Sequence, residues 1–281
     1  MPGRNSILSR LIVAALAMCL GTSAHAEKRV ALVIGNSAYQ GAPNLPNPAG
    51  DARLMSDTLV SLGFFVVGGG ALVDLTKNGF DEAVRAFGHE LAGADVALLY
   101  YAGHGVETHG LNYLVPVDAH PADEGDVLMQ MVGLASVLAQ MEQSGAKVNL
   151  VLLDACRNNP FRGRGVRSTT GGLAQMQAPP GTLISFATQP RSVALDGHHG
   201  HSPYTRALAA IIRHQGYGLF RTFNEVGLAV EKETHGRQLP WLASSPMATR
   251  FYFAGQGAPA VQAEPARDVV TSPAAPRGVP H

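Results

Sequence analysis

The sequence predicts an α/β protein whose mostly parallel sheet is covered by helices on both faces. Short apolar runs alternate along the chain with longer stretches in which apolar residues recur at helical spacing. The short runs, such as "RVALVIG" (29–35) and "DVALLYYAG" (95–103), lack the polar–apolar alternation of a half-exposed strand. Strands that are apolar throughout are typical of parallel sheets buried between two helical layers.

Each element is predicted from its own stretch of sequence. A hairpin is expected at "VETHGLNYLVPVD" (106–118). The predicted helix that begins at Asp51 carries Leu54, Met55, Leu59 and Leu62 on one face and stops at Gly63. The predicted strands are 29–35, 64–69, 95–103, 147–155, 182–188 and 249–254, and the predicted helices are 51–63, 80–92, 132–145, 202–214 and 221–236.

The two ends of the chain differ in composition from its middle. Residues 1–26 carry two early arginines, the apolar run "LIVAALAMCL" and a final "AHA", the pattern of a cleaved signal peptide. A lipoprotein signal at Cys19 is disfavoured, because the bulky Met18 precedes it. Residues 255–281 are rich in Pro, Ala and Gly, which predicts a disordered tail. We therefore expect one domain at 27–254, exported to the periplasm or secreted and not held in the membrane after cleavage.

Charge and cysteine content restrict the possible functions. The chain has 21 basic and 21 acidic residues, so its charge balance does not favour nucleic acid or an anionic membrane as a partner. Its two cysteines are Cys19 and Cys156, and cleavage after Ala26 would leave only Cys156. A lone thiol in an oxidising compartment is unusual. It is either an inert buried side chain or a reactive group.

The ends of two predicted strands favour the reactive alternative. His104 lies between glycines in "YYAGHG", and Cys156 ends "LVLLDAC", 52 residues later (156 − 104). The carboxyl ends of parallel strands meet at one edge of a sheet, where reactive groups gather. A histidine beside a thiol can take its proton and later protonate a leaving amine. The backbone N–H groups of Gly105 and Cys156 are candidates for an oxyanion hole.

Several segments carry a family resemblance, among them "RVALVIGNSAYQG", "LLYYAGHG", "NYLVPVDA", "LVLLDACRNNPF", "GTLISFATQP", "DGHHGHSPYTRALAAII" and "GRQLPWLASS". On the basis of these segments, the domain resembles the caspase-like cysteine peptidases (clan CD, family C14), specifically their bacterial metacaspase-like branch. The resemblance implies the caspase/haemoglobinase-like three-layer sandwich with a six-stranded sheet. It also implies an endopeptidase that acts on protein or peptide substrates through His104 and Cys156.

The resemblance extends to specificity. Metacaspases cleave after Arg or Lys with the help of acidic residues in the pocket for that side chain, S1. Asp154 and Asp51 match those positions, and a desolvated pair of carboxylates recognises a guanidinium well. Two alternatives stay open: Asp51 as a plain helix N-cap, and Asp154 as a structural hydrogen-bond acceptor. Many metacaspases have serine where this chain has Ala102, which weakens the predicted preference for basic residues.

No metal or cofactor is predicted. Some metacaspases bind Ca²⁺ through clustered aspartates, but "RNNPFRGRG" lacks the aspartate expected after the cysteine, and "PADEGD" (121–126) is interpreted as a solvated loop. His198, His199 and His201 could trap a metal, although a loop before a helix is the simpler interpretation. The "VVGGGA" segment leads into no dinucleotide-binding pattern.

The loop after Cys156 is a candidate for self-cleavage. Residues 157–172 are rich in Gly and include Arg162, Arg164 and Arg167, which an Arg-selective peptidase could cut. The alternative is that these arginines only solvate the loop. For the whole protein, two other functions remain open: a catalytically weak caspase-fold interaction or regulatory module, and a cysteine hydrolase for non-peptide amides. Nothing in the sequence predicts an oligomeric state.

Overall fold

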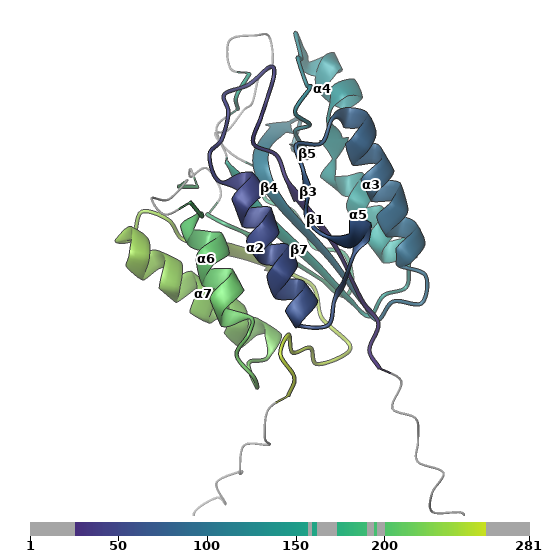
Figure 1. The fold of residues 1–281 in the computed structure, drawn as a ribbon, viewed down its shortest axis with the longest axis vertical. Coiled ribbons are helices and arrows are strands. Elements are labelled where there is room, and N and C mark those ends of the chain that lie inside the picture. The colour runs from purple at the N-terminus through teal and green to yellow at the C-terminus, as the bar shows by residue number, and fades with distance from the viewer. Residues whose placement is uncertain (1–25, 157–158, 162–172, 190–193, 196–199, 257–281) are drawn as a thin grey trace, which may run out of the picture.

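A twisted, mainly parallel sheet forms the centre of the protein. The computed structural model describes residues 26–156, 159–161, 173–189, 194–195 and 200–256, with Cys156 placed by its backbone. The main path of the sheet orders six strands as β2-β1-β4-β7-β8-β9. The first five are parallel, and β9 runs antiparallel to β8 at the edge. The caspase-like architecture expected from the resemblance is therefore confirmed (Figure 1).

Strands and helices are interspersed along the chain. The strands are β1 (Arg29–Gly35), β2 (Phe65–Val66), β3 (Leu72–Val73), β4 (Val96–Thr108), β5 (Leu111–Leu114), β6 (Val132–Gly133), β7 (Val148–Cys156), β8 (Thr182–Phe186) and β9 (Trp241–Ser244). The helices are α2 (Pro48–Ser61), the short η1 (Val67–Gly69), α3 (Lys77–Glu90), α4 (Glu124–Gln130), α5 (Leu134–Gln143), α6 (Pro203–Ile211) and α7 (Leu219–Thr234). Across these described segments, none of the helices has the length and apolar character to span a bilayer.

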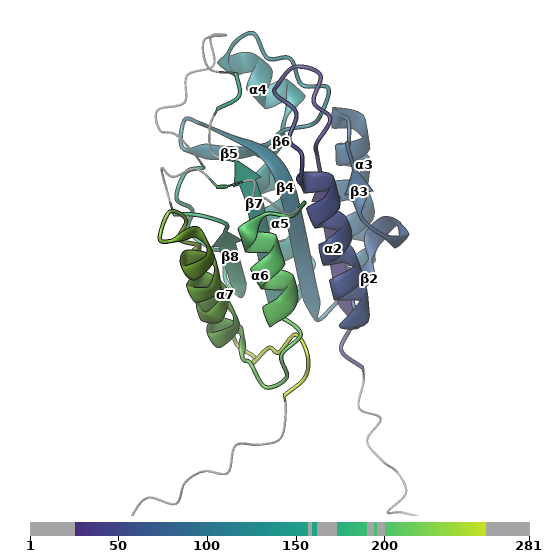
Figure 2. The same ribbon diagram turned by 60° about the vertical axis from the view of Figure 1, so that its left-hand side comes forward.

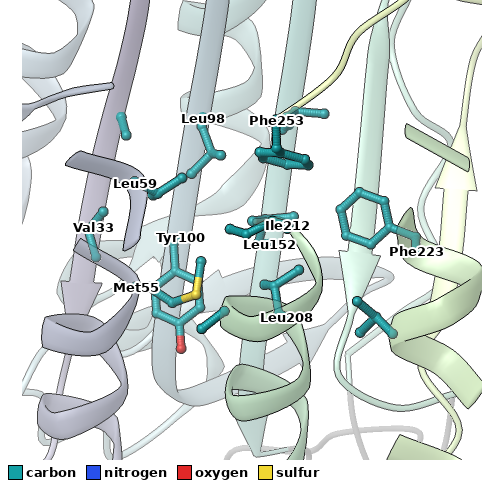
Figure 3. Packing of buried hydrophobic residues seen from close by; sticks show 14 of the residues in the cluster. Val33, Met55, Leu59, Leu98, Tyr100, Leu152, Leu208, Ile212, Phe223 and Phe253 are labelled. Atoms are coloured by element: carbon teal, nitrogen blue, oxygen red, sulfur yellow. The ribbon is translucent and has the colours of Figure 1, made fainter. Parts of the chain in front are cut away.

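The sheet separates two apolar layers. Helices α2, α6 and α7 cover one face, and α3 and α5 cover the other (Figures 1 and 2). Neighbouring residues of a strand point to opposite faces, so Leu98 and Tyr100 of β4 join the first layer and Leu99 and Tyr101 the second. In Figure 3, Met55 of α2 lies against Tyr100 of the sheet. Burial of both faces explains why the strands are apolar throughout.

Three predicted elements differ from the structure. The segment 249–254 forms only an isolated bridge between Gly218 and Tyr252. The last strand is instead β9, a four-residue strand that lies between Pro240 and Pro246 and was not predicted. The acidic stretch 121–126 is not a plain loop, because Asp123 accepts the N–H of Asp126 and caps α4. The second predicted strand, 64–69, is mostly the η1 turn after two strand residues.

Arg29 joins the start of the described chain to its end. Its guanidinium donates hydrogen bonds to the carbonyl oxygens of Phe253 (2.7 Å) and Tyr252 (3.0 Å) and lies 5.1 Å from the centroid of the Phe251 ring. A guanidinium can satisfy several acceptors and an aromatic face at once. This contact holds the segment after β9 against β1, at the end of the sheet opposite to the carboxyl ends of the parallel strands.

The contact between β1 and α2 leads to a prediction about stability. A Cβ atom on Gly35, the last residue of β1, would lie 2.2 Å from the carbonyl oxygen of Pro48 and 2.7 Å from Cβ of Ala52. Gly35→Ala should therefore push α2 off the sheet and lower the free energy of unfolding by about 1–3 kcal/mol or more, measured by denaturant titration.

Gly227→Ala is the matched control. Gly227 lies inside α7, and a Cβ there meets no atom of the described structure within 4 Å. Alanine is the better helix former, so this variant should be unchanged or more stable by up to about 1 kcal/mol. Equal stability losses in both variants would show that β1 and α2 do not depend on close contact at Gly35.

Candidate active site

The register of two strands places His104 beside Cys156. Strands β4 and β7 pair in parallel from Val96↔Val148 onward, and His104↔Cys156 is the last pair of that ladder. Immediately afterwards β4 leaves the main sheet, and Gly105↔Leu114 begins its antiparallel pairing with β5. The two residues thus lie side by side in the backbone at the carboxyl end of the sheet, as the sequence predicted.

The His104 ring is held by the loop between β1 and α2. Its Nε2 lies 2.7 Å from the carbonyl oxygen of Pro43. A carbonyl oxygen can only accept a hydrogen bond, so Nε2 must carry the hydrogen. In the neutral imidazole this leaves the lone pair on Nδ1. The Pro43 carbonyl therefore selects the tautomer in which Nδ1 is the basic nitrogen.

Two tyrosines hold the backbone of His104. The Tyr39 hydroxyl accepts the His104 N–H (2.8 Å), and the Tyr101 hydroxyl donates to the His104 carbonyl oxygen (2.7 Å). The Tyr39 ring also lies against the imidazole, with centroids 4.5 Å apart. Gly103 makes room for them, because a Cβ there would lie 2.5 Å from the Tyr39 hydroxyl oxygen, at a φ of +151°. The first glycine of "GHG" is thus required by its neighbours.

The loop that carries Tyr39 and Pro43 is itself fixed at its base. The buried Asn36 side chain donates to the Val115 carbonyl (2.9 Å) and accepts the Leu75 N–H (2.9 Å). Asp74 accepts the N–H groups of Ser37 (2.7 Å) and Ala38 (2.9 Å). These bonds explain the "GNSAY" segment: its polar residues anchor the loop that orients the histidine.

Asp51 is not a helix N-cap. Helix α2 begins at Pro48 with Asn47 as the capping position, so Asp51 lies a full turn inside the helix. Its carboxylate is buried, with 2% of the residue exposed. Oδ1 lies 2.9 Å from Nδ1 of His201, and the Ser202 N–H lies 3.2 Å from Oδ1 and 3.3 Å from Oδ2. The N-cap interpretation failed because Pro48 opens the helix earlier than the apolar pattern indicated.

Asp154 faces the first turn of α6. Its Oδ2 accepts hydrogen bonds from the hydroxyls of Ser202 and Thr205, the latter at 2.6 Å. Ser202 is also the N-cap of α6, since its Oγ accepts the Thr205 N–H (2.9 Å). The Tyr100 hydroxyl lies 2.5 Å from Oγ1 of Thr205 and extends the network into the core. Asp154 is therefore a structural hydrogen-bond acceptor, and it also lines a small pocket that it shares with Asp51.

The two carboxylates line one small pocket. Asp51, Asp154 and Ser202 share it with Gly103 and Leu45, so it opens beside the residue that precedes His104. Its free volume is about 10 Å³, room for about one water molecule. Ala102 is buried opposite Asp154 in the ladder and supplies no hydroxyl, whereas the hydroxyl of Ser202, the N-cap of α6, bonds Asp154.

The buried carboxylates shape the electrostatics of the core beneath them. Burial, and then the negative charges of Asp154 and Asp51, raise the pKa of Tyr100 well above its usual value. Burial also raises the pKa of Tyr204, and the charge of Asp154 adds to that effect although the Ser185 hydroxyl opposes it. Both phenols stay protonated and act as hydrogen-bond donors on the α6 side of the sheet.

Other predicted site residues fall in different places. Gly105 is the first residue of β4 that pairs with β5, and a Cβ there would lie 2.8 Å from Cδ2 of Leu173, a side-chain end that would have to shift. Its role in an oxyanion hole stays a prediction. Arg162, Arg164, Arg167, His198 and His199 lie outside the described residues. In the part of the chain that the structure describes, no group of three or more His, Cys, Asp and Glu side chains is placed to hold a metal ion.

Sequence reasoning missed four contributors: Tyr39, Pro43, His201 and Ser202. The signal for Ser202 was present, because Ser-Pro before an apolar helix is a typical N-cap pattern. His201 was considered only as a metal ligand, whereas the structure pairs it with Asp51. The Pro43 contact comes from a backbone carbonyl, which leaves no trace in side-chain chemistry.

Comparisons with known proteins agree with this geometry. Residues 28–252 match the caspase domain family. The human protein named mucosa-associated lymphoid tissue lymphoma translocation protein 1 is 38% identical over 133 residues, covering 47% of this chain and 15% of that protein. Its mouse homolog matches with the same identity and coverage. The chain thus spans a small part of the length of these relatives, and the family match extends over most of its own length. The protein belongs to the caspase-like (clan CD) family of cysteine peptidases.

Proposed function

We propose that this protein is an exported cysteine endopeptidase of the metacaspase-like branch that cleaves peptide bonds after Arg or Lys. Membership of a cysteine peptidase family supports a peptidase-type hydrolase acting on protein or peptide. The observation that carries the proposal is the last pair of the β4–β7 ladder, His104↔Cys156, together with the commitment of Nε2 of His104 to Pro43. Those two features give a thiol a neighbouring base with a defined basic nitrogen.

The reaction follows from that tautomer. Nδ1 of His104 takes the proton of the Cys156 thiol, and the thiolate sulfur attacks the carbonyl carbon of the scissile bond. The C–N bond then breaks, the leaving nitrogen takes the proton from Nδ1, and a thioester remains on Cys156. A water molecule gives a proton to Nδ1 and attacks the thioester, which releases the acid product and restores the thiol. The Pro43 carbonyl stabilises the imidazolium throughout.

The pocket beside Gly103 supports the preference for a basic side chain. Asp51 and Asp154 come from α2 and β7 and converge on a site that lies next to the strand end bearing His104. Two buried carboxylates attract a guanidinium or ammonium group and repel an acidic side chain. The hydroxyls of Ser202 and Thr205 and the N–H of Ser202 donate to these carboxylates without adding a charge of their own.

Replacing Cys156 with alanine tests the nucleophile. Cys156→Ala should fold, because it ends a strand and the change removes one atom, and it should lose peptide cleavage by a factor of about 10⁴ or more. The measurement is turnover of reporter peptides with Arg before the scissile bond, with thermal unfolding as the folding check. Persistent cleavage by a well-folded Cys156→Ala protein would refute the assignment.

The same two proteins address self-cleavage in the loop 157–172, which lies outside the described residues. Each is incubated alone and any new termini are mapped by mass spectrometry. Termini after Arg162, Arg164 or Arg167 in the wild type alone support self-processing. An intact wild type that still cleaves peptides contradicts it, and the arginines would then only solvate the loop.

Substrate preference tests the acidic pocket. Peptides with Arg before the scissile bond should be cleaved at least about 30-fold faster, in kcat/KM, than matched Asp peptides, because truncating or reversing one partner of a buried charge pair costs about 2–5 kcal/mol. Asp154→Asn should lose most of that preference, since it keeps an acceptor for Ser202 and Thr205 but removes the charge.

Asp57→Asn serves as the control for that variant. It makes the same change at an exposed residue of α2, whereas Asp51 is on the buried side of that helix. Its kcat/KM for Arg peptides should match the wild type. Equal rates for Arg and Asp peptides in the wild type would remove the acidic pocket from the proposed function and leave the nucleophile untouched.

A further inference from the structure

We propose that His201 is a specificity-determining residue of the S1 pocket: it occupies Asp51 in the substrate-free enzyme and must be displaced by the basic side chain of the substrate. The proposal rests on the proposed function, because it assumes that Asp51 receives that side chain. The contact that carries it is the 2.9 Å hydrogen bond between Nδ1 of His201 and Oδ1 of Asp51.

The chemistry of the contact makes His201 a competitor of the substrate. A carboxylate accepts hydrogen bonds only, so the Nδ1 of His201 donates to it. A guanidinium would present the same kind of donor to the same oxygen. A carboxylate oxygen offers about two lone-pair sites, and Oδ1 of Asp51 already accepts from Nδ1 of His201 and from the Ser202 N–H. A guanidinium that donates to this oxygen therefore competes with the imidazole contact.

Compared with Ser202 and Thr205, His201 is the donor that can move away from the carboxylates more easily. Ser202 is buried and is the N-cap of α6. Its N–H donates to Asp51, and its hydroxyl both donates to Asp154 and accepts the Thr205 N–H that caps the helix. Thr205 is fully buried within α6. By contrast, the His201 side chain is 34% exposed and lies ahead of the helix. Moving it breaks one partly buried hydrogen bond, whereas moving Ser202 or Thr205 would disrupt the first turn of α6.

The pocket is so small that a side chain must move before a guanidinium group can enter. A free volume of about 10 Å³ admits about one water molecule, which is too small for a guanidinium group. Gly50, in the first turn of α2, shows how closely the segment before α6 is seated: a Cβ there would lie 3.3 Å from the Gly200 carbonyl oxygen and 3.7 Å from Cε1 of His201. Gly200 and His201, which precede the pocket-lining Ser202, are therefore in contact with the helix that carries Asp51.

The test compares His201→Ala and His201→Gln with the wild type in the full chain. Removing a partly exposed competitor should lower KM for Arg peptides by about three- to fivefold and leave kcat unchanged. In the Cys156→Ala background, acetyl-arginine amide should bind more tightly by a similar factor, whereas its neutral isostere acetyl-citrulline amide should not gain. His201→Gln keeps a donor for Asp51 and should stay close to the wild type.

His89→Ala, an exposed histidine on α3 across the sheet, is the matched control and should change nothing. A raised KM in His201→Ala, with weaker arginine binding, would overturn the proposal and show that His201 positions Asp51 for the substrate. Unchanged constants would overturn it as well. A wild type that neither cleaves Arg peptides nor binds acetyl-arginine amide would instead refute the acidic pocket itself.

Discussion

The arrangement depends on the ladder between β4 and β7 and on its end. Parallel pairing carries the two strands together for nine residue pairs and stops at His104↔Cys156, where β4 departs toward β5. A slip of one residue would turn the side chains of a strand to the opposite face. Because both faces of the sheet are buried, the apolar side chains of the ladder resist such a slip. The packing of the core thereby fixes which residues meet at the reactive edge.

The remaining parts of the site are supplied from one side of the sheet. The loop after β1 brings Tyr39 and the Pro43 carbonyl to His104, and α2 and α6 bring Asp51 and Ser202 to the pocket next to it. These two helices lie side by side over the same face (Figures 1 and 2). Gly35 at the end of β1 lets α2 approach closely enough for this. The helices on this face and the loop that leads into α2 therefore supply the contacts of both His104 and the pocket.

Most of the fold was predictable from the sequence, because strands buried on both faces leave continuous apolar runs. The exceptions have physical causes: β9 is a four-residue edge strand with no buried residue, and α4 begins in an acidic stretch. His104, Cys156, Asp154 and Asp51 could be named because strand ends and family motifs mark them. The Pro43 contact and the pairing of His201 with Asp51 could not, since they join segments far apart in sequence through a backbone carbonyl and a loop.

The reactivity of the thiol gives the most direct measurement of whether His104 activates Cys156. The alkylation rate of Cys156 by iodoacetamide is followed at pH 7 by mass spectrometry, in the wild type and in His104→Ala. A thiolate is the reacting species, so an adjacent imidazole should make the wild type react faster, and its loss should slow alkylation by about tenfold. Equal rates in two folded proteins would contradict the pairing, whatever peptides the enzyme cleaves.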